Sequence, residues 1–223
     1  MRGILPVLHS DTEVLAALES DSAKIIAAPP SYPFLIALKA QQHPVLVVTS
    51  SSRSAEDLAE SLRDLHSRVY EFPAWETLPH ERLSPRSDTV AQRIATLYSL
   101  QLSEATHPVV VAPVRAVIHR FIASLATKPL WTLEIGQEIG LTELITHLTE
   151  LAFTRTDLVE KRGEFAVRGG IVDVFLPLAM HPVRIDFFGD EIEELRYFEV
   201  ADQRTSEAVI GKLSILPCRE FLL

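Results

Sequence analysis

The sequence predicts two domains of different class: an α/β domain with a parallel sheet, followed by a smaller α+β domain built on antiparallel hairpins. Two observations carry this prediction. Through residues 1–128, short apolar strands alternate with helical patterns, which is typical of a parallel sheet with crossover helices. From residue 129 onward, strands follow one another across glycine-containing tight turns, which is typical of antiparallel pairs.

The predicted elements of the first domain depend on apolar periodicity and on helix caps. Ser10 and Glu13 have the spacing of a capping box at the start of the first helix. Leu58, Leu62 and Leu65 share one face of a later helix, which one of the preceding serines caps. In chain order we expect a helix over 11–20, a strand over 23–28, a helix over 33–42, a strand over 45–49, a helix over 55–66, a weak strand over 69–72, a helix over 88–100 and a buried strand over 109–112.

In the second domain we expect a strand over 131–135, a helix over 142–151, an extended segment over 153–159, two hairpins and a strand over 213–217. We interpret the last strand as returning to the first domain. The predicted boundaries are therefore 1–128 for the α/β domain, 129–212 for the α+β domain and 213–223 for the returning strand.

The two hairpins are the most informative part of the chain. Their strands alternate apolar and polar residues and are joined at Gly169-Gly170 and at Gly189-Asp190, dipeptides that accept the positive φ angles of tight turns. In the second hairpin Val183, Ile185 and Phe187 share one parity, so we expect them to point into a core.

The opposite parity carries a candidate binding face. Arg184, Asp186 and Phe188 should point outward, and so should Arg168, which lies beside the first turn. An exposed aromatic flanked by arginines has the composition of a protein-binding hot spot. The alternative is that a neighbouring domain of the same chain covers Phe188.

Composition limits the remaining functions. Of the 223 residues, 47% are hydrophobic and 23% are charged, which is ordinary for a globular protein. No run of about 18 apolar residues is present, so we expect no membrane span. The first residues contain too short an apolar stretch for a signal peptide, and the single cysteine, Cys218, excludes an internal disulfide. Both observations favour a reducing, cytoplasmic location.

The net charge of −9 argues against an autonomous DNA-binding domain. Proteins that grip nucleic-acid phosphates are normally basic, because Lys and Arg release condensed counterions when they bind. A local basic patch within an acidic protein is still compatible with this composition.

The residues needed for catalysis are absent. A phosphate-binding loop needs glycines whose N–H groups surround the phosphate, yet there is no glycine between Gly3 and Gly136, and the connection over 27–33 contains three prolines. The acidic run at 190–193 lies on a hairpin turn, so it is not a Walker B strand end. The eight histidines show no metal-ligand spacing, and no G-x-S-x-G motif occurs. We therefore predict no catalytic residue, no metal and no cofactor.

A long irregular connection over 72–88 is rich in proline and aromatic residues. Loops of this kind inside compact domains are often functional. We favour the alternative that Phe72, Trp75 and Leu83 pin the loop to its own domain, because aromatic anchors serve packing first.

Long motifs carry a family resemblance over essentially the whole chain. The sequences F-P-A-W-E-T-L-P, R-G-E-F-A-V-R-G-G-I-V-D-V-F and R-I-D-F-F-G-D-E-I-E-E-L resemble the amino-terminal, UvrB-like module of the transcription-repair coupling factor family, Mfd. UvrB itself is similar in the hairpin motifs. It has, however, a working phosphate loop and a tyrosine-rich hairpin that this sequence lacks.

The resemblance implies a degenerate P-loop, helicase-like domain joined to a UvrA-binding domain that acts in nucleotide excision repair. The UvrA-contacting positions of the family correspond to Arg168, Arg184 and Phe188. A carboxy-terminal domain of the family masks this face. ATP, Mg²⁺, RNA polymerase and DNA are expected to engage only the downstream translocase parts. The alternative function is that of a UvrB-type repair helicase fragment that binds DNA and ATP.

Overall fold

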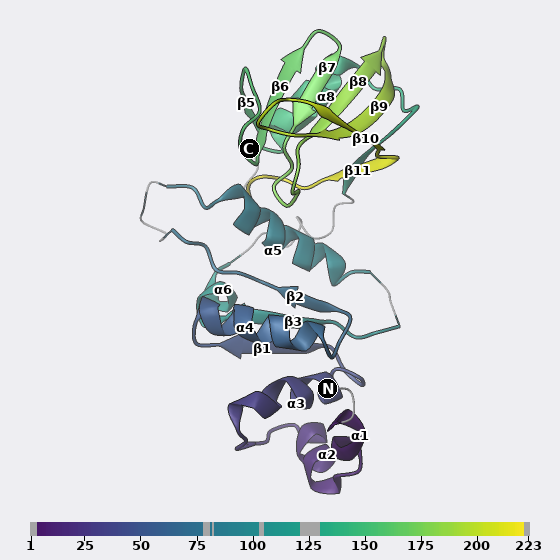
Figure 1. Cartoon of the computed structure of the whole chain (residues 1–223). Coiled ribbons are helices and arrows are strands. Elements are labelled where there is room, and N and C mark those ends of the chain that lie inside the picture. The colour runs from purple at the N-terminus through teal and green to yellow at the C-terminus, as the bar shows by residue number, and fades with distance from the viewer. Residues whose placement is uncertain (1–3, 78–80, 82, 103–104, 121–129, 221–223) are drawn as a thin grey trace. The chain divides into compact units, whose positions relative to one another are not determined.

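The structure, a computed structural model, describes residues 4–77, 81, 83–102, 105–120 and 130–220 (Figure 1). The chain divides into two compact units. Unit 1 comprises Met1–Ala74 with Ser99–Arg120, and unit 2 comprises Trp75–Tyr98 with Phe121–Leu223.

Unit 1 contains a three-stranded parallel sheet in the order β1-β3-β2 (Figure 1). Its strands are β1 (Val45–Thr49), β2 (Val69–Glu71) and β3 (Val109–Pro113). Every residue of the central strand β3 is buried, as its uninterrupted apolar run predicts. The predicted α/β class is confirmed.

The helices of unit 1 are α1 (Ile4–His9), α2 (Thr12–Glu19), the short 3-10 helix η1 (Pro29–Ser31), α3 (Tyr32–Lys39), α4 (Ser52–Arg63) and α6 (Val114–Ile118). Helix α4 packs on the sheet through Ala55, Ala59 and Leu62, in one cluster with Val109 and Val111. Its cap is a serine, as predicted: the hydroxyl of Ser51 accepts a hydrogen bond from the backbone N–H of Ser54 at 3.1 Å.

Two local predictions in unit 1 were wrong. Residues 23–28 form no strand, and Ile26 is exposed. The following Pro29 and Pro30 lack N–H groups and begin η1, so the apolar run ends before it can pair with β1. Helix α2 is capped by the carboxylate of Asp11, which accepts from the N–H groups of Glu13 and Val14, and not by a capping box at Ser10. The likeness to a P-loop fold remains a prediction.

Unit 2 contains a six-stranded sheet in the order β10-β9-β8-β7-β6-β5 and a two-stranded sheet of β4 and β11. All neighbours in the larger sheet are antiparallel except β5 and β6. The elements are α5 (Ser87–Ser99), β4 (Trp131–Glu134), α8 (Leu141–Glu150), β5 (Thr154–Arg155), β6 (Glu164–Arg168), β7 (Ile171–Val174), β8 (Val183–Phe188), β9 (Glu191–Phe198), β10 (Thr205–Val209) and β11 (Lys212–Ile215). The last residue of α5, Ser99, falls in unit 1.

One core lies between α8 and the larger sheet. Leu144 and Leu148 of α8 are buried in the same cluster as Phe165 and Ile185 of the sheet. This arrangement confirms the α+β character expected of the second domain. It also shows which face of the hairpins packs against α8.

The final strand differs from the predicted division of the chain. Strand β11 pairs with β4, and Leu213, Ile215 and Cys218 belong to the core of unit 2. The last strand thus belongs to unit 2 and does not return to the first domain. Its pairing with Trp131–Glu134 is not visible in local periodicity. Strand β10 was not predicted, because Thr205–Val209 is mostly exposed and lacks alternation.

The connection over 72–88 was expected to be pinned to its own domain by Phe72, Trp75 and Leu83, but its two anchored aromatic residues fall in different units. Phe72 is buried in unit 1, whereas in unit 2 the indole N–H of Trp75 donates to Glu220 Oε1 at 3.0 Å. Glu220 also forms a buried ion pair with Arg93 of α5. Leu83 is exposed, so its expected anchoring role was wrong. Residues 78–80 and 82 lie outside the described part of the chain.

Candidate protein-interaction face on the hairpins

The two predicted hairpins are confirmed. Strands β6 and β7 pair across Gly169-Gly170, and β8 and β9 pair across Gly189-Asp190. Gly169 has φ +60° and Gly189 has φ +65°, a left-handed conformation that favours glycine and explains the residue choice at both turns. Because β7 also pairs with β8, the hairpins form one continuous surface.

The inward parity of β8 is confirmed. Val183 and Ile185 are buried, and Phe187 is half-buried and packs against the core of unit 2. The side chains on the other face of β8 therefore point away from α8. They form the candidate face.

Phe188 is the exposed hydrophobic residue of this face. Its side chain is 76% exposed at the end of β8, next to the turn glycine. The outward position expected from alternation is confirmed. Because Phe188 belongs to a hydrogen-bonded strand, its backbone is already ordered before any partner binds the exposed ring.

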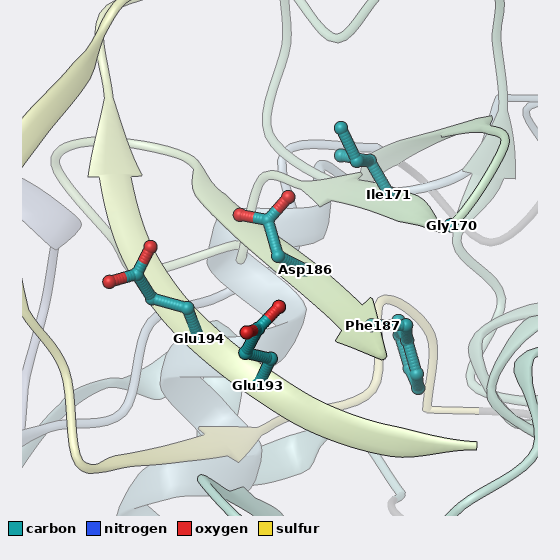
Figure 2. Close-up of a pocket in the computed structure, with 6 residues that line it drawn as sticks. All are labelled: Gly170, Ile171, Asp186, Phe187, Glu193 and Glu194. Atoms are coloured by element: carbon teal, nitrogen blue, oxygen red, sulfur yellow. The ribbon is translucent and has the colours of Figure 1, made fainter. Parts of the chain in front are cut away.

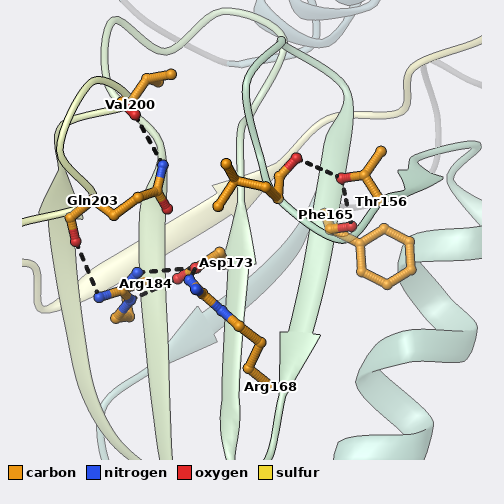
Figure 3. A network of polar contacts seen from close by, with 8 residues as sticks. Thr156, Phe165, Arg168, Asp173, Arg184, Val200 and Gln203 are labelled. Atoms are coloured by element: carbon orange, nitrogen blue, oxygen red, sulfur yellow. Dashed lines mark hydrogen bonds and ion pairs between the residues drawn. The ribbon is translucent and has the colours of Figure 1, made fainter.

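Arg168 and Arg184 meet at one buried carboxylate, that of Asp173 on β7 (Figure 3). Arg184 donates from Nε to Oδ1 at 2.7 Å and from Nη2 to Oδ2 at 3.0 Å, while Arg168 donates from Nη2 to Oδ2 at 2.5 Å. The Asp173 side chain is 1% exposed. Asp173 was not predicted from the sequence, since its contact with both arginines depends on the register of three strands.

The two arginines differ in accessibility. The Arg184 side chain is only 16% exposed, and its guanidinium lies 4.9 Å from the centroid of the Phe198 ring. Its Nη1 donates to the backbone carbonyl of Gln203 (Figure 3). Hydrogen bonding to Asp173 raises the pKa of Arg184, against the opposing effect of burial, so the group stays charged. The Arg168 side chain is 47% exposed.

A hollow of about 600 Å³ opens on the same face of the sheet (Figure 2). Its lining is Gly170, Ile171, Asp186, Phe187, Glu193 and Glu194. A β-bulge shapes it: Asp186 pairs with Glu194 but Phe187 pairs with Ile192, which leaves Glu193 as an extra residue. Strict alternation does not predict such a bulge, so the hollow could not be found from the sequence.

The hollow is electrostatically negative. Burial raises the pKa of Asp186, and the neighbouring Glu194, Asp173 and Glu193 raise it further, while Arg184 opposes them. In the described part of the chain, no group of three or more His, Cys, Asp or Glu is arranged to hold a metal ion. Among the same residues, no helix is long and apolar enough to cross a membrane.

A comparison with protein families identifies the class of this domain. Residues 131–221 match the family model described as the UvrB interaction domain. They include both hairpins, α8 and the β4–β11 pair. This part of unit 2 is therefore similar to the UvrB interaction domain.

Comparison with curated proteins gives the family at large. The chain is 46% identical over 211 residues to the transcription-repair-coupling factor of Mycobacterium tuberculosis. The aligned residues make up 89% of this chain and 17% of that protein. It is 33% identical over 191 residues to that of Escherichia coli, covering 84% and 16% respectively. The chain therefore belongs with the transcription-repair coupling factors, as its motifs predict, and it spans about a sixth of their length.

Proposed function

We propose that this chain is a non-catalytic interaction module that recruits UvrA in nucleotide excision repair through the face formed by Arg168, Arg184 and Phe188. The observation that carries the proposal is Phe188, which is exposed at the end of β8 on the sheet that also holds Arg168 and Arg184. The family match to a UvrB interaction domain supports a partner that UvrB shares.

The three residues contribute in different ways under this proposal. Phe188 inserts into an apolar pocket of the partner, where a buried aromatic anchor contributes about 2–4 kcal/mol. Arg168 bonds Asp173 through Nη2, and its exposed side chain can reach a partner carboxylate. Arg184, which is mostly buried, supports the surface more than it reaches beyond it.

The decisive experiment measures the affinity of the full chain for UvrA by calorimetry, with and without Phe188→Ala. We expect binding to weaken by about 30- to 1,000-fold, which corresponds to the loss of about 2–4 kcal/mol. Phe188→Ala is a cleaner variant than Arg184→Ala, because removal of Arg184 leaves the buried Asp173 with one partner fewer.

Met180→Ala is the matched control. Met180 is 82% exposed in the connection between β7 and β8, so the variant also removes exposed apolar area from this domain. We expect Met180→Ala to bind UvrA as the unchanged chain does. Equal affinities for Phe188→Ala and the unchanged chain would contradict the proposed site.

In the longer proteins of this family, we propose that a carboxy-terminal domain covers the Phe188 face until UvrA is engaged. We further propose that an ATP- and Mg²⁺-dependent translocase, acting on RNA polymerase and DNA, lies in the part that this chain does not span. Phe188 supports the first proposal, because an exposed aromatic on a binding face is a liability when no partner is present.

The alternative is a UvrB-type fragment that binds ATP. The match to a family model described as the UvrB interaction domain favours this alternative. Titration of the chain with ATP and Mg²⁺ separates the two functions. We expect no heat of binding, because the three prolines of the connection over 27–33 supply no N–H groups to a phosphate.

A further inference from the structure

We infer that Asp173 is a positioning residue of the UvrA-binding face: its carboxylate holds Arg168 and Arg184 in the arrangement that the partner recognises. This inference rests on the proposed function above and adds to it a residue that touches no partner itself. Its basis is the geometry of three adjacent strands.

The register of the sheet brings the three residues together. Asp173 on β7 pairs directly with Arg184 on β8 and with Ala166 on β6. Arg168 lies two residues further along β6, on the same face as Ala166. Since alanine is small, the space beside Asp173 is open to the longer side chain of Arg168.

Asp173 is fully engaged by the two guanidinium groups. Oδ1 accepts from Arg184, and Oδ2 accepts from both Arg184 and Arg168. A carboxylate buried this deeply needs such partners, because the loss of water destabilises its charge. The bonds in turn restrict the rotamers of both arginines.

The charges of this cluster do not cancel. Asp186 also acts electrostatically on Arg184, but within the cluster of Arg168, Arg184 and Asp173 two guanidinium groups share one carboxylate, which leaves one positive charge. It is presented at Arg168, the more exposed of the two arginines. A carboxylate of the partner is the chemistry that fits this position.

Without the Asp173 charge, the two guanidinium groups repel each other and Arg168 is free to move into solvent. The partner must then immobilise Arg168 on binding, which weakens the complex. The expected effect of Asp173→Asn, which preserves the shape of the side chain, is a loss of UvrA affinity of roughly tenfold.

The test is a double-mutant cycle on the full chain, with UvrA affinity and thermal unfolding measured for each variant. Asp173→Asn is compared in the unchanged background and in the Arg168→Ala background. We expect the roughly tenfold loss in the first and less than about twofold in the second, because Arg168, the more exposed of the two arginines that Asp173 holds, is then absent. Asp202→Asn, on an exposed turn of the same domain, is the control and should bind normally.

Three outcomes separate the inference from the proposed function. If the chain does not bind UvrA, or Phe188→Ala binds unchanged, the proposed function itself fails. If Phe188→Ala loses affinity while Asp173→Asn does not, the function stands and the positioning role is overturned. Equal losses for Asp173→Asn in both backgrounds indicate a structural role only, and they also overturn it.

A measurement on the unchanged chain covers the case in which Asp173→Asn fails to fold. NMR relaxation of the arginine Nε–H groups reports how ordered each side chain is. Arg168 and Arg184 should relax like the backbone, in contrast to the exposed Arg53 of unit 1. An Arg168 signal as mobile as that of Arg53 would overturn the inference.

Discussion

Phe187 and Phe188 are adjacent phenylalanines with opposite environments. One packs against the core of unit 2 and the other is exposed. The difference follows from the period of two residues along a strand, and it is the part of the candidate site that the sequence could predict. Asp173 and the acidic hollow could not be predicted in the same way. They depend on cross-strand register and on a bulge, which no single strand encodes.

Cys218 should be chemically inert in the folded protein. Burial raises the pKa of its thiol to about 12, so that almost no thiolate exists near neutral pH. We expect no reaction with a thiol-specific reagent at pH 8 until urea unfolds the chain. Rapid labelling of the folded chain would contradict this prediction.

The raised pKa of Cys218 also makes the free energy of unfolding depend on pH in the alkaline range. The folded pKa lies above the ordinary value of 9.0, so the thiol contributes stability that is present below pH 9 and is lost as the pH rises toward about 12. Cys218→Ala lacks this group. We expect its stability to depend less on pH in that window, as measured by urea unfolding.

The raised pKa of Asp186 should make the free energy of unfolding depend on pH in the acidic range. Its folded pKa is raised, so its contribution to stability is greatest below the ordinary value of 3.8 and is lost as the pH rises through the folded pKa. At pH 7 the ionised carboxylate is therefore mildly destabilising. We expect Asp186→Asn to raise the Tm at pH 7 by roughly 1–2 °C, an advantage that disappears below about pH 3.8. A lower Tm at pH 7 would contradict this account.

Among the secondary-structure elements, the antiparallel hairpins and helix α4 followed local signals. Turn glycines, alternation and serine caps act over a few residues, and the sequence displays them directly. Two predictions that failed in unit 2 depend on distant partners: the strand over 213–217 was expected but its pairing was not, and β10 was not expected at all. Strand β11 is defined by its pairing with β4, and the unpredicted strand β10 by its place beside β9.

Helix α5 shows the same limit. Val90 and Ile94 form the buried stripe that helical periodicity predicts. Arg93 of the same helix is also buried, which its residue type argues against. Its partner in the ion pair, Glu220, lies 127 positions later in the sequence, so the sequence gave no sign of the pairing.

This pair should make α5 sensitive to single substitutions. Arg93→Ala leaves the buried Glu220 carboxylate without its cationic partner, and we expect it to lower the free energy of unfolding by about 3–5 kcal/mol. Arg93→Met with Glu220→Leu removes both charges and should cost far less. Chemical denaturation of the three proteins tests this. Equal losses for the single and double variants would show that packing, and not charge, is responsible.

For the whole molecule, the net charge of −9 sets the expected behaviour toward nucleic acid. Nonspecific DNA binding depends on counterion release by basic residues, and typical dissociation constants are about 1–100 μM at physiological salt. We expect no shift of a fluorescent DNA duplex at about 10 μM protein under those conditions. Binding that persists at this concentration and weakens with added salt would reveal a basic patch.

The place of Phe188 on β8 has a consequence for the rates of association. Strand β8 has hydrogen-bonded neighbours on both sides, so the partner meets a surface that is already formed and does not wait for a loop to fold. In such complexes, substitutions change mainly how long the partners stay together and not how often they meet. Under the proposed function, a substitution at Phe188 should therefore shorten the lifetime of the complex with UvrA more than it slows the formation of the complex.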